Sequence, residues 1–553
     1  MAESPSSGGR AVVDALLAVG VDHAFCVPGE SFLGVLDALF DEPRIRVVAT
    51  RHEGGASFMA EAFAKLTRRP AVCMGTRAVG AGNLAIGIHT AAQDSTPLIA
   101  LVGQVATGQR YREAFQETEL TAAFAPLAKW TVEPPAADRL GELTLRAGRL
   151  AVAGRPGPVV VVLREDLLDQ TVPRLAPRPL VAPRPAPDPA AVREAADLLR
   201  TAERPVMLLG VGVLAAGASD AFVRLAELAQ VPALAAWRRP DVFPNSHPLY
   251  LGHSGIGAVP EVVDRLLSAD LVLAVGTRLN QYTSLEYRVP APASRLVQVD
   301  LSAEVLGGHG QADVACVSDA GLFAEALLAA LAAEPPCPDA LAARRARNAA
   351  DRAAWEEQTT PTRGKARPGY LDQQAVSAHL RRALPRDTIV TTDAGNFSGW
   401  PARYLRWQRP GTFLGPTSGA MGYAIPAAIG AKLARPGQPV VALVGDGGFL
   451  MTGTEIETAA RERAPFVSLV YDNAQYGTIR MHQEREHPGR PVATALGPVD
   501  AAAFARSLGG YGWTVRDEAE LPAALDEALA ADRPSVLHLL VDPQQISVAG
   551  DGG

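Results

Sequence analysis

The chain has 553 residues, of which 48% are hydrophobic, so it can bury more than one core. The usual domain size suggests about three or four domains. A formal net charge of −7 provides no polybasic surface, so neither nucleic acid nor an anionic membrane is expected as a partner.

The four cysteines include no Cys-x-x-Cys pair, which argues against a disulfide framework or a zinc site and fits a reducing cytoplasmic setting. The N-terminus lacks a basic segment followed by an apolar one, and no run of about 18 apolar residues occurs. We therefore expect a cytoplasmic protein that is neither exported nor membrane-spanning.

Alternation of apolar strands and helical stretches indicates three units of the same kind. Residues 1–170 predict a first α/β domain, and the proline-rich stretch 171–189 predicts an extended linker. A second α/β unit is expected at 190–333, a second linker with a charged helix near 340–357 at 334–369, and a third unit at 370–553. The predicted fold class is α/β, with three doubly wound parallel-sheet domains.

The expected strands are short apolar runs. They lie at 46–49, 71–74, 98–102 and 159–163 in the first unit, at 206–209, 271–275 and 296–300 in the second, and at 388–392, 440–444 and 466–471 in the third.

Polar side chains follow two of the strands expected in the third unit. Asp446 lies in Gly-Asp-Gly after the strand at 440–444, and Asn473 follows the strand at 466–471, with a helix from about Thr454 between them. Parallel strands joined by a right-handed crossover end at one edge of a sheet, so both side chains should lie there. A carboxylate, an amide and the backbone carbonyl of Gln475 form an all-oxygen set that suits Mg²⁺.

The glycines beside Asp446 suit a phosphate ligand. Gly445, Gly447 and Gly448 allow the backbone to approach a diphosphate closely, and the start of a helix adds a favourable field. Gly-Asp-Gly by itself is also a common turn. Its pairing with Asn473 across one strand–helix–strand unit is more specific, and it resembles the signature of thiamin diphosphate enzymes. The three-layer architecture resembles the acetolactate synthase and pyruvate oxidase group.

A glutamate in the first unit matches the family's proton-transferring residue. Glu53 lies just beyond a strand end, and a helix is expected after Gly54-Gly55. Taken alone, it is an ordinary first-turn acid favoured by the helix dipole. The resemblance implies that Glu53 hydrogen-bonds the pyrimidine ring of the cofactor and drives the aminopyrimidine to its imino form, which removes the thiazolium C2 proton. Burial of such a carboxyl would move its pKa toward neutrality.

Residues 417–428 are similar to the family's GTMGFGLPAA segment. The resemblance implies that Met421 wedges between the two cofactor rings and that the Gly419 carbonyl accepts a bond from the amino group. It also implies that the loop from Asp393 to Asn396 cradles the diphosphate. The alternatives are a methionine that fills a core and a plain Asx turn.

Further matches favour the acetolactate synthase branch. Residues 103–105 read GQV and residues 114–117 read AFQE, as in that branch, and a lysine follows at 129. The resemblance makes Gln116 and Lys129 candidates for holding the carboxylate or carbonyl of a substrate, although such residues are more often solvated surface groups. The same segments supply Gln104 and Phe115 as further candidates for the substrate channel.

Other positions bear on the choice of branch because this sequence differs there from the residues that a branch carries. The adjacent histidine pair of pyruvate decarboxylases does not occur in the chain, and Thr76 stands where benzoylformate decarboxylases have a catalytic histidine. Arg77 replaces a serine of the synthases and could bind a carboxylate or point to solvent. Residues 276–282 lack two acids and an arginine of the synthase segment GVRFDDR, and His482 replaces a tryptophan. We expect an acceptor pocket that differs from that of a biosynthetic acetolactate synthase.

The sequence of the middle unit leaves open whether a second cofactor binds. Residues 210–213 contain a lone Gly-x-Gly after a strand, which is weak evidence for a dinucleotide. Residues 252–255 and Asp300 partly match positions around the flavin of the synthases. FAD is therefore one expectation, and a vestigial nucleotide fold with a packing role is the other.

Together these features predict an enzyme dependent on thiamin diphosphate and Mg²⁺ that decarboxylates a 2-oxo acid, with pyruvate as the expected donor, and joins the product to a second carbonyl. One alternative is a decarboxylase or carboligase of specialised metabolism with another acceptor. A more distant one is a non-catalytic, nucleotide-binding regulatory relative. The resemblance implies a homodimer or homotetramer and leaves open whether a small regulatory subunit binds.

Overall fold

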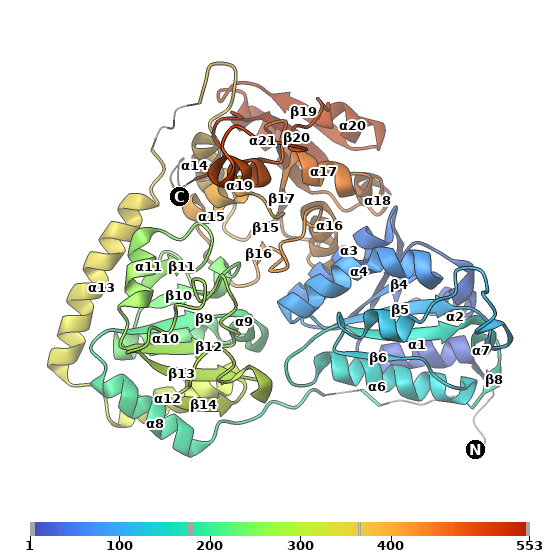
Figure 1. Ribbon diagram of the computed structural model, residues 1–553, viewed down its shortest axis with the longest axis horizontal. Coiled ribbons are helices and arrows are strands. Elements are labelled where there is room, and N and C mark those ends of the chain that lie inside the picture. Colours follow the sequence, from blue (N-terminus) through green and yellow to red (C-terminus); the bar gives the residue numbers. More distant parts are fainter. Residues whose placement is uncertain (1–5, 174–177, 180, 363, 365, 549–553) are drawn as a thin grey trace.

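The computed structural model describes residues 6–173, 178–179, 181–362, 364 and 366–548. Within these ranges, three six-stranded parallel sheets form three α/β domains that sit at the corners of a triangle (Figure 1). The predicted fold class is thereby confirmed. The predicted strands are present, with ends that differ by no more than two residues.

The first and third sheets share one topology. In chain order their strands follow the pattern 2-1-3-4-6-5, written β3-β2-β4-β5-β7-β6 and β16-β15-β17-β18-β20-β19. The first sheet comprises β2 (His23–Cys26), β3 (Arg46–Ala49), β4 (Ala71–Gly75), β5 (Leu98–Gln104), β6 (Trp130–Val132) and β7 (Val159–Arg164). The third comprises β15 (Ile389–Thr392), β16 (Phe413–Leu414), β17 (Val440–Gly445), β18 (Val467–Asp472), β19 (Tyr511–Val515) and β20 (Ser535–Leu540).

The middle sheet has a different order, β11-β10-β9-β12-β13-β14, in which the direction of winding reverses between β9 and β12. That is the strand order of dinucleotide-binding folds. Its strands are β9 (Pro205–Leu209), β10 (Ala233–Ala235), β11 (Tyr250–His253), β12 (Leu271–Val275), β13 (Arg295–Asp300) and β14 (Val314–Val317). A two-residue strand, β1 (Ser6–Ser7), pairs antiparallel with β8 (Thr171–Val172).

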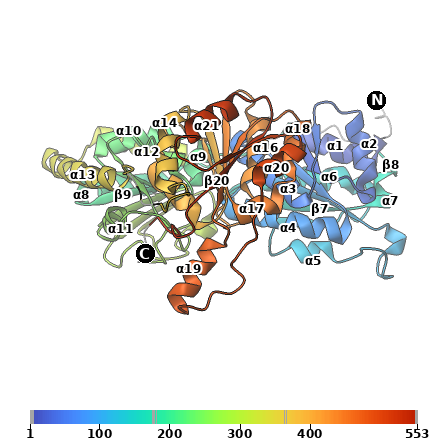
Figure 2. The ribbon, with the colours of Figure 1, turned by 90° about the horizontal axis from the view of Figure 1, so that it is seen from above.

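Helices cover both faces of the sheets (Figures 1 and 2). In the first domain they are α1 (Gly8–Ala18), α2 (Leu33–Phe40), α3 (Glu53–Thr67), α4 (Arg77–Asp94), α5 (Leu120–Phe124), α6 (Leu140–Val152) and α7 (Glu165–Leu168). The middle domain has α8 (Pro189–Thr201), α9 (Val211–Ala216), α10 (Ser219–Ala229), α11 (Pro260–Leu267), α12 (Ala320–Ala333) and α13 (Pro338–Gln358). The third has α14 (Gln373–Ala383), α15 (Gly399–Tyr404), α16 (Ala424–Ala434), α17 (Asp446–Thr452), α18 (Glu455–Arg461), α19 (Gly477–Glu486), α20 (Ala501–Ser507) and α21 (Leu521–Ala530).

The first and third domains share one hydrophobic core. Buried residues of α3, α4, α16 and α18 belong to a single cluster. Helices α3 and α16 approach each other closely, since a Cβ on Gly430 would lie 2.4 Å from the Met59 carbonyl oxygen. Glycine is required there because the two backbones leave no room for a side chain. This packing fixes the two domains relative to each other.

Helix α13 lies in the predicted second linker but packs on the middle domain. Trp355 joins the middle hydrophobic core. The buried Arg344 guanidinium donates to the carbonyl oxygens of Ala229 at 2.8 Å and Leu199 at 2.6 Å. Buried cations need such partners, so these carbonyls hold the helix against the domain.

Two helix starts differ from the sequence-based expectation. Helix α3 begins at Glu53 and not after Gly55, because His52 Nδ1 caps the Gly54 N–H at 3.0 Å. Helix α17 begins at Asp446 itself, eight residues before the expected Thr454, and a break at Gly453 and Thr454 separates it from α18. Both carboxylates therefore lie in the first turn of a helix, where the helix field favours negative charge.

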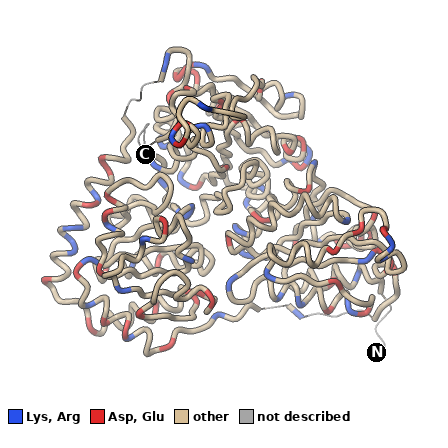
Figure 3. Tube along the Cα trace, viewed as in Figure 1, with Lys and Arg blue, Asp and Glu red and all other residues tan. Residues whose placement is uncertain are grey.

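The surface carries mixed charge. Basic and acidic residues are interspersed along all three domains (Figure 3). Across the described ranges, no helix has both the length and the apolar composition needed to cross a bilayer.

Candidate active site

Asp446 and Asn473 lie at the carboxyl edge of the third sheet, as predicted from the chain order. Strands β17 and β18 pair in parallel with Gly445 opposite Tyr471, so the residues that follow both strands emerge on one edge. Asp446 Oδ1 accepts the Gly447 N–H at 2.8 Å. The other oxygen, Oδ2, is buried and has no hydrogen-bond partner within the described part of the chain. An unpartnered buried carboxylate oxygen indicates a missing cation or donor.

A second carboxylate reinforces this indication. Burial, together with the adjacent Asp472 carboxylate, raises the pKa of Asp446 to about 7. Asp472 Oδ2 itself lies 2.7 Å from His538 Nε2, which helps to hold the pKa of Asp472 below its usual range. A divalent cation at this edge would compensate the two neighbouring acids.

The donor set fits Mg²⁺. In the described residues no group of three His, Cys, Asp or Glu side chains could hold a metal. The set would instead combine Asp446, the Asn473 amide and oxygens from backbone, water or phosphate, which is the chemistry that Mg²⁺ prefers. The third predicted ligand, the carbonyl oxygen of Gln475, already accepts the Gly477 N–H at 2.9 Å and keeps one lone pair.

Met421 and Gly419 lie beside the Gly-Asp-Gly segment. A Cβ on Gly447 would lie 3.3 Å from Met421 Cε, so the methionine side chain rests against that glycine. Gly419 has φ +73° and open space where a Cβ would be. The loop therefore leaves room for a ligand next to the methionine.

Asp393 holds the loop that carries Met421 through hydrogen bonds. Its two carboxylate oxygens accept the N–H groups of Gly422 at 2.8 Å and Ala424 at 2.6 Å. A Cβ on Gly448 would lie 2.1 Å from Asp393 Oδ2, so glycine is required there. The carboxylate is fully buried, which raises its pKa to about 6. Asp393 thus positions the Met421 turn and does not extend toward a ligand.

Asn396 lies on the adjacent loop and faces α19. Its Oδ1 accepts the Thr478 hydroxyl at 3.0 Å, and its Nδ2 lies 3.3 Å from Met481 Sδ. Asn396, Gly419 and His482 all line a cavity of about 680 Å³, which we call the main cavity. Its opposite wall comes from the middle domain.

Glu53 lies on the first domain, apart from the Asp446 and Met421 group on the third domain. We call these two groups the half-sites. Its Oε2 accepts the Asn83 Nδ2–H at 2.9 Å. The segment before it is held by Glu455 of α18, a fully buried carboxylate that accepts the N–H groups of Arg51 at 3.2 Å and His52 at 3.0 Å. The third domain therefore sets the backbone from which Glu53 projects.

Family models match these two half-sites and the domain between them. The N-terminal TPP binding domain of thiamine pyrophosphate enzymes matches residues 6–123, the central domain matches 192–327, and the C-terminal TPP binding domain matches 393–539. The chain belongs to the thiamine pyrophosphate enzyme family. The predicted family and the predicted use of thiamin diphosphate are thereby confirmed.

Relatives of this thiamine pyrophosphate enzyme cover nearly its whole length. A probable acetolactate synthase large subunit of Methanocaldococcus jannaschii is 31% identical over 97% of this chain and 92% of its own. An acetolactate synthase of Mycobacterium bovis is 32% identical over 97% of this chain and 88% of its own. An acetolactate synthase large subunit of Corynebacterium glutamicum is 30% identical, with 97% and 87% covered. The enzyme is therefore acetolactate synthase-like.

The candidate substrate-binding residues of this thiamine pyrophosphate enzyme differ in whether they have hydrogen-bonding groups left for a substrate. Gln104 is fully buried and bonded to the backbone at both ends of its amide, which donates to the Thr118 carbonyl at 2.8 Å and accepts the Val105 N–H at 3.0 Å. It anchors the loop that carries Phe115 and Gln116. Phe115 is 73% exposed, whereas Gln116 Oε1 is buried without a partner in the described residues. Gln116 is thus the group in this loop with a free acceptor.

Lys129 already forms hydrogen bonds with other groups of the protein. Lys129 Nζ donates to the carbonyl oxygens of Leu150, Ala153 and Arg155 at 2.7, 2.5 and 2.9 Å, so all three of its N–H donors are used at the end of α6. This arrangement leaves no donor for a substrate.

Arg77 forms ion pairs with Glu165 at 2.8 Å and Glu30 at 3.4 Å, which neutralise its charge. Its side chain does not point into open solvent, because it is largely buried. It lines a separate cavity of about 330 Å³ with Phe115.

His482 remains in the main cavity, where its Nδ1 accepts a bond from Arg485 at 2.9 Å.

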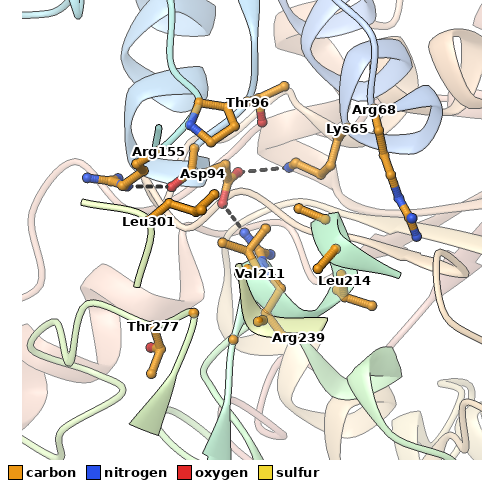
Figure 4. A pocket seen from close by; sticks show the side chains of 18 of the residues that line it. Lys65, Arg68, Asp94, Thr96, Arg155, Val211, Leu214, Arg239, Thr277 and Leu301 are labelled. Atoms are coloured by element: carbon orange, nitrogen blue, oxygen red, sulfur yellow. Dashed lines mark hydrogen bonds and ion pairs between the residues drawn. The ribbon is translucent and has the colours of Figure 1, made fainter. Parts of the chain in front are cut away.

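A further cavity of about 450 Å³ lies between the first and middle domains, at the point where the middle sheet reverses, and Phe413, Leu414, Thr417 and Arg435 of the third domain also line it. A Cβ on Gly212 would lie 2.6 Å from Gly276 Cα, so the Gly-x-Gly segment serves close backbone packing. Figure 4 shows Lys65 and Arg239 pointing toward Asp94, which they contact at 2.8 and 2.5 Å.

Several of these residues carry no sequence motif. Asn83 lies in the same compared segment as Arg77, and Glu455 lies in the helix after Gly-Asp-Gly. A position close to a motif could therefore have pointed to both residues. Asp94 and Arg239 lie 145 positions apart and offered no such signal.

Proposed function

We propose that the enzyme uses thiamin diphosphate and Mg²⁺ to decarboxylate a 2-oxo acid, with pyruvate as the first donor to test, and joins the remaining carbons to a second carbonyl. The observation that carries the proposal is the unpartnered buried oxygen of Asp446 at one sheet edge with Asn473, next to the turn that holds Met421. The bound cofactor supplies the electron sink for carbon–carbon cleavage.

The residues of the chain would act in three ways. Asp446 and Asn473, with the Gln475 carbonyl, would hold the metal. Met421 would support the cofactor beside Gly447, against which its side chain already rests. The Glu53 carboxyl would hold and exchange a proton at the pyrimidine nitrogen, a task suited to a positioned carboxyl group.

The test is release of labelled carbon dioxide from 1-¹³C-pyruvate by the purified protein, with thiamin diphosphate and Mg²⁺ added and the products identified. Carbon dioxide and acetolactate are expected, and Glu53→Gln should abolish release while Glu518→Gln, on the exposed surface, should not. If the protein binds the cofactor but releases no carbon dioxide from pyruvate or larger 2-oxo acids, the proposed function is rejected.

The acceptor is the part of the proposal that separates an acetolactate synthase from a carboligase of specialised metabolism. The middle-domain wall of the main cavity carries Trp237, Arg238 and Tyr282, with Trp237 and Tyr282 ring centroids 4.6 Å apart. The choice between a second pyruvate and another acceptor would be made at this wall. Competition between pyruvate and aldehyde acceptors, read by product chromatography, distinguishes the two outcomes.

We propose a homodimer as the smallest active form, with a homotetramer as its higher assembly. Within the described residues, Glu53 and Asp446 of one chain do not contact each other; each bonds a near neighbour. Exposed apolar side chains flank both half-sites: Val79 and Ile86 on α4, and Leu450 and Met451 on α17. A second copy would cover them and complete each site. Light scattering of wild type and Leu450→Glu tests this, with a monomer that binds cofactor weakly expected for the variant.

For the cavity between the first and middle domains we propose a dinucleotide, with FAD as the candidate. Two of its lining arginines, Arg155 and Arg278, bond only backbone and neutral side-chain oxygens in the described structure, so they remain available to a diphosphate. The absorbance spectrum of the purified protein, and of the supernatant after denaturation, tests for bound flavin. A colourless protein that binds ADP would retain a nucleotide site without flavin.

A further inference from the structure

The described lining of the main cavity contains basic side chains and no acidic one. Its described lining residues include Arg238, Arg485, His253 and His482 but no Asp or Glu. Burial lowers the pKa of His253 to about 4, so this imidazole is neutral near pH 7. Arg485 already has a carboxylate partner, since Glu486 lies 3.9 Å away, so Arg238 is the arginine of this lining that would attract an anionic ligand.

Arg238 is the arginine on the inner wall. Its guanidinium donates one bond, at 3.2 Å, to the carbonyl oxygen of Asp393, where the loop to Asn396 begins. It also lies over the Trp237 ring at 5.4 Å. No carboxylate of the described residues lies within ion-pair distance of it, although Asp94 and Asp393 act on its charge from farther away. Burial lowers its pKa to about 10, so it still carries its charge near pH 7.

The backbone of Arg238 is strained. Its φ is +62°, in the left-handed region that residues with side chains rarely adopt. Such strain persists where surrounding structure holds a residue for a task.

The next residue, Arg239, differs from Arg238 in having a carboxylate partner. Arg239 points into the other cavity, where it forms an ion pair with Asp94 at 2.5 Å and donates to the Arg238 carbonyl oxygen at 2.6 Å. The left-handed turn thus sends two consecutive arginines to opposite sides, one paired with Asp94 and one without a carboxylate at ion-pair distance in the described residues.

We propose that Arg238 binds the carboxylate of the 2-oxo acid substrate in the main cavity and thereby determines specificity for acids over neutral carbonyl compounds. This inference rests on the proposed function. A planar guanidinium with one edge held by Asp393 and its face on Trp237 presents its remaining N–H donors in fixed directions, which matches the two oxygens of a carboxylate. The cavity also contains Gly419, on the loop beside Met421, so the bound acid would lie near the cofactor.

The diphosphate of the cofactor is the competing anion, because the Asp393 loop is also the expected diphosphate loop. The two assignments differ in what an Arg238→Gln substitution changes. If the guanidinium binds substrate, KM for the 2-oxo acid rises about tenfold or more, with a smaller change in kcat and no change in thiamin diphosphate affinity. If it binds diphosphate, cofactor affinity falls and KM at saturating cofactor is unchanged, which overturns the proposal.

A matched control is available. Arg463 is also left-handed, with φ +53°, but it is exposed and far from the main cavity, so Arg463→Gln should leave both constants unchanged. Unchanged KM and cofactor affinity in Arg238→Gln would overturn the proposal as well. Should Arg238→Gln fail to fold, Arg238→Lys keeps the charge without the planar donors and is expected to raise KM by a smaller factor; wild-type KM in that variant overturns the need for a guanidinium.

Binding without turnover separates this inference from the proposed function. Calorimetry of the protein loaded with thiamin diphosphate and Mg²⁺ would use oxamate, an unreactive analogue of pyruvate, and neutral oxamide. We expect oxamate to bind wild type at least tenfold more tightly than Arg238→Gln, and oxamide to bind both equally weakly. Such a result with no carbon dioxide release from any 2-oxo acid would reject the proposed function and leave the carboxylate site standing. Equal oxamate binding by both proteins would reject the site.

Discussion

Asp94 joins all three domains and offers the sharpest test of the packing described above. Its carboxylate is fully buried and accepts bonds from Lys65 of the first domain at 2.8 Å, Arg239 of the middle domain at 2.5 Å and the Thr417 hydroxyl of the third at 2.6 Å. Lys65 has a second acid within reach, since Glu61 lies 2.8 Å away. Arg239 has no second carboxylate at ion-pair distance in the described residues, and Asp241 and Glu61 act on it only from farther away, so Asp94→Asn leaves it buried without a direct ion-pair partner.

The cost follows from that unpaired guanidinium. Removing one partner of a buried ion pair destabilises a protein by roughly 3–5 kcal/mol, and the asparagine oxygen that remains places this case near ~3 kcal/mol. For a cooperative unit of 150–250 residues, each kcal/mol lowers the melting temperature by about 2–4 °C. We therefore expect Asp94→Asn to melt about 6–12 °C below wild type.

Differential scanning calorimetry measures this shift, and a double-mutant cycle with Arg239→Met tests its cause. If the penalty comes from the buried arginine, the double variant should be more stable than the sum of the two single changes implies. A shift below about 2 °C, or strict additivity in the cycle, would refute the reasoning because either result means that the pair carries little of the interdomain stability.

The same pair predicts a pH dependence. Lys65 and Arg239 overcome the effect of burial and hold the pKa of Asp94 below its usual range. A carboxyl whose folded pKa is depressed contributes stability above its unfolded pKa of about 3.9, and that contribution is lost as pH falls toward the folded pKa. Wild type should therefore lose stability below about pH 4 more steeply than Asp94→Asn.

Three further changes test other parts of the structure. Gly430→Ala puts a methyl group 2.4 Å from the Met59 carbonyl and should lower the melting temperature by several degrees, while Gly437→Ala, where the space is open, should not. Asp446→Asn should weaken Mg²⁺-dependent binding of thiamin diphosphate by about 100-fold, read by fluorescence titration, and retained binding would remove Asp446 from the metal site. Glu455→Ala removes the carboxylate that accepts the N–H groups of Arg51 and His52, so we expect kcat to fall and stability to drop by about 1 kcal/mol, whereas normal kcat would show that Glu53 is positioned without it.

The sequence by itself determined the three-domain α/β architecture and the edge of the sheet where the cofactor motifs meet. The strands could be predicted because parallel sheets buried on both faces need continuous apolar runs such as Val159 to Leu163. Asp446 and Asn473 could be placed on one edge because the handedness of the crossover is nearly invariant. Each of these inferences depends on short stretches of chain and on rules that hold in any context.

Only the tertiary structure decided which polar residues are free to act. Lys129 and Gln104 match a substrate-channel pattern, yet the fold supplies each with backbone partners. Arg238 and Arg239 are adjacent in sequence, but one is paired by Asp94 and the other faces the main cavity. The physical reason is that hydrogen-bond saturation and charge neutralisation depend on groups far away in the chain, which no local pattern of residues can specify.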